Sequence, residues 1–209
     1  MKPGRKSREE RLTIGHSGVW GSSSQDFIRL AYLLFEKSAE YAKSIDGNCS
    51  IYSLAGIPIL FSALRCLLIE ANAGIYCSEY NQGILDKLAK SPNDISIFIE
   101  IYEPIQKLRE DIEILYEIRN EIIHPSHKPV GSPNNTPDYL NSLRERRLLQ
   151  STNKEDCDYI WLSQLQSHRL FFWAFETIES AARHILSSHN NQDLESIMVS
   201  YARYRYVNL

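Results

Sequence analysis

The sequence contains little that would place it in a specialised class of protein. Its four cysteines are scattered without C-x-x-C spacing, so free thiols in a reducing compartment are expected. Nine glycines and eight prolines in 209 residues are too few for a low-complexity chain. The formal net charge of −3 argues against a basic protein that coats duplex nucleic acid, so any contact with nucleic acid should be local.

A long uninterrupted apolar run is also missing. The most hydrophobic stretch, Leu54 to Gly74, is broken by a set of polar, charged or helix-bending residues, namely Pro58, Ser62, Arg65 and Glu70. A charge near the centre of a bilayer costs about 2.5–3.5 kcal/mol, so we interpret this stretch as a buried helix of a soluble bundle. Residues 1–26 lack the apolar core of a signal peptide, and the cytoplasm is the expected location.

Strand-like alternation is absent from the sequence, and apolar residues recur instead at steps of three and four residues. This spacing is typical of helices with one buried face, and 43% apolar residues suffice for a core. The sequence therefore predicts an all-α protein, a bundle of four to six helices. The helices are expected over about 23–46, 52–73, 82–90, 93–124, 139–149 and 159–187.

Breaks in the pattern suggest how the chain is divided. Pro104 should kink the long helix over 93–124 or mark its true start, and Pro125 should end it at His124. The expected organisation has a flexible N-terminal arm over 1–24, a helical bundle over 25–190 with a long polar loop over 125–156, and a C-terminal helix or tail over 191–209.

The end of the helix over 93–124 carries the residues best suited to chemistry, in the stretch RNEIIH from Arg119 to His124. Histidine titrates near neutral pH and exchanges protons, and arginine presents a permanently charged planar fork to a phosphate. Five positions on an unbroken helix differ in direction by roughly 140°, so the break at Pro125 is needed to bring the two side chains together. Asn120 precedes His124 by four residues, shares its helix face, and is positioned to orient the imidazole.

An arginine followed by a histidine after four to six intervening residues occurs twice more, at Arg11–His16 and Arg183–His189. Only the pair at Arg119 and His124 has a following asparagine, a place on the third long helix and a long polar loop after it. A simpler interpretation stays open, in which Arg119 forms a surface ion pair with a neighbouring glutamate, Glu117 or Glu121, and His124 only ends the helix.

The stretch RNEIIH at the end of the third long helix resembles the R-x(4–6)-H motif of HEPN domains, and the helix order over 25–190 is also similar. The resemblance implies an up-and-down helical bundle that cuts RNA without a metal or cofactor. In such a reaction the 2′-hydroxyl attacks the adjacent phosphorus and leaves a 2′,3′-cyclic phosphate. It also implies that Arg119, Asn120 and His124 are catalytic and that a homodimer brings two motifs to one cleft.

The resemblance further implies a toxin or antiviral defence effector, restrained by a separately encoded antitoxin or defence-system partner. The alternative is a noncatalytic HEPN-like module for dimerisation or for binding nucleotides or proteins. His124 and His127 have no cysteine or carboxylate at a matching spacing nearby, so no metal site is expected.

Other polar groups allow two interpretations each. A basic set after the motif suits either an RNA backbone clamp or a solvated helical face, and consists of Lys128, Arg144, Arg146 and Arg147. The stretch YARYRY over 201–206 suits base stacking or a packed terminal helix. Arg65 and Glu70 suggest a buried ion pair or polar contacts on the helix face, or one of them lining a cleft beside Arg119.

Overall fold

The computed structural model describes residues 23–44, 49–75, 80–91, 93–124, 138–150 and 161–189. These residues are mostly helical and contain no named strand, which confirms the predicted all-α class. The helices are α2 (Ser23–Ser44), α3 (Tyr52–Asn72), α4 (Gln82–Lys90), α5 (Asp94–Tyr102), α6 (Gln106–Ile123), α7 (Asp138–Glu145), α8 (Trp161–Gln164) and α9 (His168–Ser188). Lys128, the stretch over 201–206 and residues 1–22 of the expected arm lie outside the described residues.

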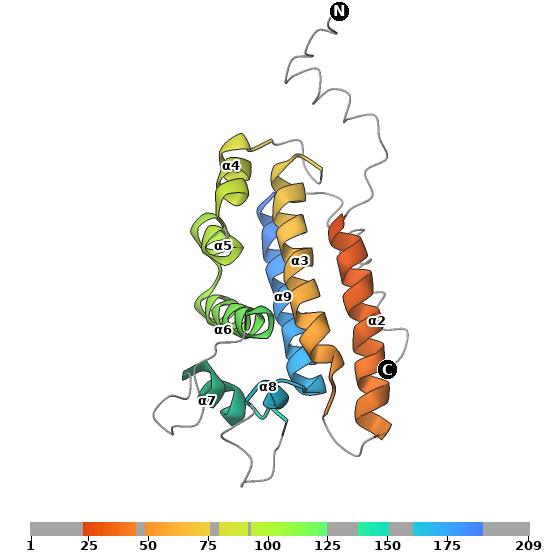
Figure 1. The fold of residues 1–209 in the computed structure, drawn as a ribbon. Coiled ribbons are helices and arrows are strands. Elements are labelled where there is room, and N and C mark those ends of the chain that lie inside the picture. The colour runs from red at the N-terminus through yellow and green to blue at the C-terminus, as the bar shows by residue number, and fades with distance from the viewer. Residues whose placement is uncertain are drawn as a thin grey trace, which may run out of the picture.

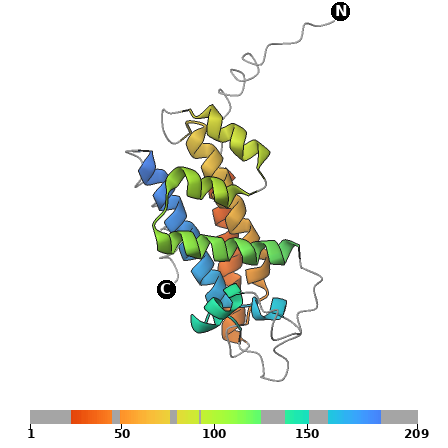
Figure 2. The same ribbon diagram turned by 90° about the vertical axis from the view of Figure 1, so that its left-hand side faces the viewer.

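The helices are arranged in three layers (Figure 1). Helix α2 forms one outer layer, α3 and α9 lie side by side in the middle, and α4, α5 and α6 form the other outer layer. Helices α3 and α9 run in the same direction and α2 runs opposite to both. Figure 2 shows α6 lying across α3 and α9 rather than along them. The candidate motif is therefore carried by a helix that departs from an up-and-down arrangement.

Helix α3 is the centre of the core. Its buried leucines face α2 on one side and α9 on the other, and they are Leu60, Leu64, Leu67 and Leu68. Within the described part of the chain, α3 is the one helix long and apolar enough to span a membrane, with a mean hydropathy of 1.8 and 56% of that window buried.

The contact between α3 and α9 depends on a glycine. A Cβ atom added to Gly56 would lie 1.9 Å from Cζ of Phe171, so the aromatic ring occupies the space that any larger residue would need. Just before the two helices, the amide of Ser50 donates to the carbonyl of Gln166 at 2.9 Å. The amino-terminal ends of α3 and α9 are thus held together by both packing and main-chain pairing.

The two charged residues inside α3 do not form the ion pair that the sequence suggested. Arg65 binds both carboxylate oxygens of Asp94 at 2.5 and 2.7 Å, at the start of α5. Glu70 is buried and accepts hydrogen bonds from the amide and the hydroxyl of Ser24 at 3.0 and 2.5 Å. Each charge therefore fastens α3 to a different helix, and Glu70 satisfies a free amide at the start of α2.

Two of the long helices are each split, the first of them at Pro104, where a kink or a true helix start was expected. The helix predicted over 93–124 divides into α5 and α6 because Glu103 adopts a left-handed conformation, with φ of 44°, before Pro104. The helix predicted over 159–187 divides into α8 and α9, and the hydroxyl of Ser167 accepts from the amide of Leu170 at 3.1 Å to begin α9. The helix predicted over 139–149 ends at Glu145, shortly before Arg147 with φ of 56°.

We predict a pH dependence of stability from His168 at the start of α9. Its Nδ1 lies 2.9 Å from the hydroxyl of buried Ser38, and burial, with a smaller effect of Lys43, lowers the pKa of the imidazole. The unfolded chain binds this proton near pH 6.5 and the folded chain only at lower pH. Acidification below about pH 6.5 therefore favours the unfolded state and lowers the free energy of unfolding.

Urea unfolding at pH 7 and pH 5 measures this contribution. His168→Gln removes the titrating group and should lose less stability than the wild type between the two pH values. Equal losses in both proteins would show that His168 does not contribute to the acid sensitivity.

Candidate functional site

The candidate site lies at the carboxyl end of α6, which ends where the sequence predicted. Ile118 and Leu115 are fully buried and hold this part of the helix against the core. His124 follows the last helical residue with φ of −129° and ψ of 67°, outside the helical region, as expected for a residue before proline. The side chain of His124 is exposed to solvent.

Arg119 is half-buried one turn before this end, and it has no carboxylate partner among the described residues. Its Nη1 donates a hydrogen bond to Oδ1 of Asn120 at 2.9 Å. Glu117 and Glu121 are each two positions away on the helix, which turns their side chains about 200° from that of Arg119. The structure therefore contradicts the simpler interpretation in which Arg119 forms a surface ion pair with one of these glutamates.

Asn120 links the two other residues, but not in the way the sequence suggested. Its side-chain oxygen holds the guanidinium of Arg119, while its main-chain carbonyl accepts from the amide of His124 at 2.7 Å. In the described structure, no hydrogen bond joins the Asn120 side chain to the imidazole of His124. Asn120 thus positions the guanidinium and the backbone of the histidine rather than the imidazole ring.

Tyr139 of α7 is a residue near this helix end that the sequence analysis missed. Its hydroxyl is buried without a hydrogen-bond partner in the described structure. Burial raises the pKa of Tyr139, and the carboxylates of Glu121 and Glu117 add to the increase. Tyr139 therefore lies on the side of α6 that carries these glutamates. No sequence spacing indicated this, because α6 and α7 are far apart in the sequence.

Two of the basic residues predicted to clamp RNA, Arg144 and Arg146, are held by other parts of the fold. Arg146 pairs with the buried carboxylate of Asp111, and its guanidinium lies 5.8 Å from the centre of the Trp173 ring. Asp111 precedes Arg119 by eight residues, or about 12 Å along the helix axis. Arg144 instead binds Asn141 and Gln164, each at 3.3 Å.

A substitution tests whether Arg146 is structural. Arg146→Ala should lower the free energy of unfolding by about 1–3 kcal/mol, because it leaves the carboxylate of Asp111 buried without its partner. Arg147→Ala, at an exposed position next to it, should have little effect on stability. Thermal or urea unfolding of the two variants makes the comparison, and equal stability of both would contradict a structural role for the Arg146 ion pair.

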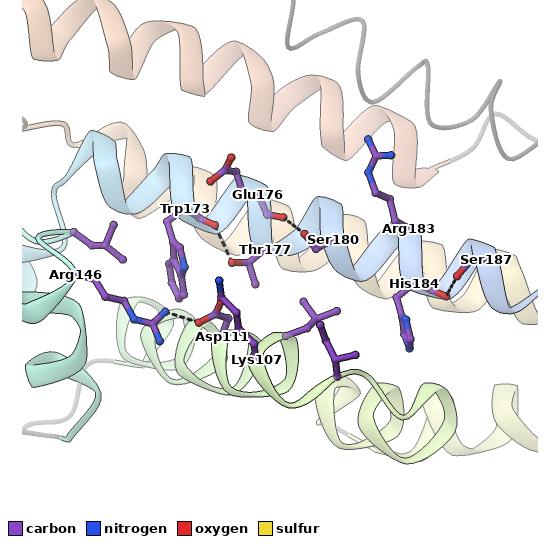
Figure 3. A pocket seen from close by; sticks show the side chains of 13 residues that line it. Lys107, Asp111, Arg146, Trp173, Glu176, Thr177, Ser180, Arg183, His184 and Ser187 are labelled. Atoms are coloured by element: carbon purple, nitrogen blue, oxygen red, sulfur yellow. Dashed lines mark hydrogen bonds and ion pairs between the residues drawn. The ribbon is translucent and has the colours of Figure 1, made fainter.

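Figure 3 shows a groove along α9 and α6 that the sequence analysis also missed. Its volume is about 1100 Å³, and its lining includes Lys107, Asp111, Arg146, Trp173 and Thr177. These residues come from helices far apart in the sequence, so no local motif reveals the groove. Neither Arg119 nor His124 lines it.

The competing match at Arg183 and His189 is accounted for by structural contacts. Arg183 donates to the carboxylate of Glu179 at 2.6 Å, one turn earlier on α9. Nε2 of His189 lies 2.9 Å from the hydroxyl of Tyr102, which also accepts from the side chain of Asn72 at 2.9 Å. These contacts join the ends of α3, α5 and α9, so this pair holds the fold together.

In the described part of the chain, no three histidine, cysteine, aspartate or glutamate side chains are grouped so that they could hold a metal ion. The arrangement at the end of α6 instead offers a guanidinium for binding an anion and a solvent-exposed imidazole for proton transfer. No protein-family model, curated protein or solved structure matches this chain, so the chemistry of the site is inferred from its own residues.

Proposed function

We propose that this protein is a metal-independent endoribonuclease of HEPN type, acting as a toxin or antiviral defence effector in the cytoplasm. The observation that carries the proposal is the state of Arg119. This half-buried arginine has no carboxylate partner in the described structure, and its guanidinium binds the side chain of Asn120. The exposed side chain of His124 follows five residues later, at the end of the same helix. A guanidinium in this state keeps N–H donors that can contact phosphate oxygens.

The reaction uses both side chains. Attack of the 2′-hydroxyl on the adjacent phosphorus creates a phosphorane with additional negative charge, and the guanidinium of Arg119 stabilises that charge. Of its five N–H donors, one binds Asn120 and the others are available to phosphate oxygens. The imidazole of His124 accepts the proton of the attacking hydroxyl or donates one to the leaving 5′-oxygen.

The full reaction requires both of these proton transfers, and each chain supplies one His124. The proposal therefore includes a homodimer in which the second chain contributes the other imidazole. Ile123, next to His124, exposes 39% of its surface, which is consistent with an apolar contact between two chains at this point. RNA is the substrate, and a separately encoded antitoxin or defence partner would restrain the activity.

The test is cleavage of a single-stranded RNA by the purified full chain in the presence of EDTA. The expected products carry a 2′,3′-cyclic phosphate and a 5′-hydroxyl. The matched substrate has 2′-deoxyribose at the cleaved positions and should resist cleavage, because the nucleophile is missing. Cleavage of the deoxy substrate, or a requirement for a divalent metal, would contradict the proposal. Binding of RNA without cleavage would favour the noncatalytic module instead.

A further inference from the structure

The outer face of α2 carries two leucines that no other described helix covers. Leu30 exposes 44% and Leu33 58% of its surface, although the opposite face of the same helix is buried against the core. Helix α2 forms one outer layer of the described structure (Figure 1). Adjacent large apolar side chains on an exposed helix face suggest a contact with another helix.

The residues around the leucines repeat in the manner of a helix-pairing seam. Asp26, Leu30, Leu33 and Lys37 follow one another at steps of four, three and four residues. At 100° per residue these four side chains lie within an arc of roughly 60°. Side chains spaced by three and four residues lie along one face of a helix, where they can all contact the same partner helix, as in coiled coils.

The charges on this seam complement those of a second copy turned the other way. If two α2 helices pair antiparallel about a twofold axis, Leu30 of each chain lies opposite Leu33 of the other. Asp26 is four residues before Leu30 and Lys37 is four after Leu33, so Asp26 then faces the partner's Lys37. The twofold axis creates this opposite-charge contact twice, on either side of the leucines.

The present ion pairs of these residues do not oppose such pairing. Asp26 lies 3.7 Å from Arg29, and Lys37 lies 2.7 Å from Glu40, with all four side chains more than half exposed. Exposed pairs within one helix contribute little to stability and rearrange readily. In the antiparallel pair, Glu40 also lies near the amino-terminal end of the partner's α2, where negative charge is favoured.

We propose that this protein self-associates through the seam Asp26, Leu30, Leu33 and Lys37 of α2, packed antiparallel against the same seam of a second copy. This interface is separate from the one that the proposed ribonuclease requires. Helices α2 and α6 lie in opposite outer layers, so pairing through α2 leaves the His124 side of each chain free (Figure 1). One helix from each chain makes a small interface, so the association is expected to be weak and concentration-dependent.

Charge reversal tests the proposed register. Asp26→Lys alone places two lysines opposite each other, and Lys37→Asp alone places two aspartates opposite each other. Each change should weaken association through α2 by about 10-fold. In an equal mixture of the two full-length variants, both contacts again join opposite charges, and association between them should return to the wild-type level.

Sedimentation equilibrium on the wild type, on each variant and on the mixture gives the comparison. Leu33→Asp, which buries a charge in the proposed seam, should abolish this association, and circular dichroism checks that each variant is folded. Any dimer formed near His124 contributes equally to all samples, so the difference between the mixture and the single variants isolates α2. Equal association of all samples overturns the proposal for α2 alone. A monomeric wild type overturns both this proposal and the homodimer of the proposed ribonuclease, and the RNA cleavage assay tests cleavage independently of either result.

Discussion

Replacing His124 by alanine is expected to reduce the rate of RNA cleavage by about 10²–10⁴-fold, because it removes a proton carrier from the reaction. Arg119→Ala should cause a loss of about 10²–10³-fold, since the phosphorane loses a positioned positive charge. Arg119→Lys keeps the charge but not the planar fork that contacts two oxygens together, so it should restore only part of the rate. Initial rates on a single RNA substrate, at saturating substrate concentration, measure these effects.

Arg109→Ala is the matched control for the loss of an arginine from α6. Arg109 is exposed and binds Glu113 at 3.1 Å, far from the end of the helix, so its removal should leave the cleavage rate unchanged. The exposed position of His124 means that His124→Ala should unfold at the same temperature as the wild type. If all these variants cleave RNA equally, any activity of the protein arises elsewhere.

The largest expected effect on stability comes from Gly56→Ala. The new Cβ atom would lie 1.9 Å from Cζ of Phe171, and both residues are buried between α3 and α9. Overpacking of this kind typically costs about 1–3 kcal/mol, and the direct overlap with a ring places this variant at about 3 kcal/mol or above. Urea unfolding monitored by circular dichroism should show a lower midpoint for Gly56→Ala.

Gly83→Ala in α4 is the matched control. A Cβ atom there meets only the side-chain oxygen of Asn81 at 3.6 Å, an ordinary contact distance. Alanine is a better helix former than glycine, so this variant should be as stable as the wild type or slightly more so. Phe171→Leu in the Gly56→Ala background should recover part of the lost stability, because it removes the ring. If Gly56→Ala were as stable as the wild type, α3 and α9 would be able to move apart at this point without a loss in the free energy of unfolding.

The helices themselves were largely predictable from the spacing of apolar residues. Helix α4 begins and ends at Gln82 and Lys90 as predicted, and α6 ends before His124 because Pro125 restricts the residue in front of it. The break at Glu103 and Pro104 lies where Pro104 was expected to kink the helix or mark its true start, whereas the break before α9 was not predicted. At each place three residues, 103–105 and 165–167, leave the helical conformation while the apolar pattern continues across the break.

The candidate site was predicted in part. Its residues Arg119, Asn120 and His124 share the end of α6 because they are close in sequence, whereas the convergence of the Arg119 and His124 side chains stays a prediction. The role of Asn120 was predicted wrongly, because its side chain binds Arg119 rather than the imidazole. That choice depends on which rotamers the surrounding helices permit, and helical spacing does not specify them.

By itself, the sequence determined the helical class of this protein, the end of α6 and the grouping of three polar residues there, because these features depend on interactions within a few residues. Only the tertiary structure decided which charges are paired. It assigned Arg65 to Asp94, Glu70 to Ser24 and Arg146 to Asp111, and it left Arg119 without a carboxylate partner in the described residues. Such pairings join segments that are distant in the chain, so they follow from the way the helices pack against one another and not from any local spacing.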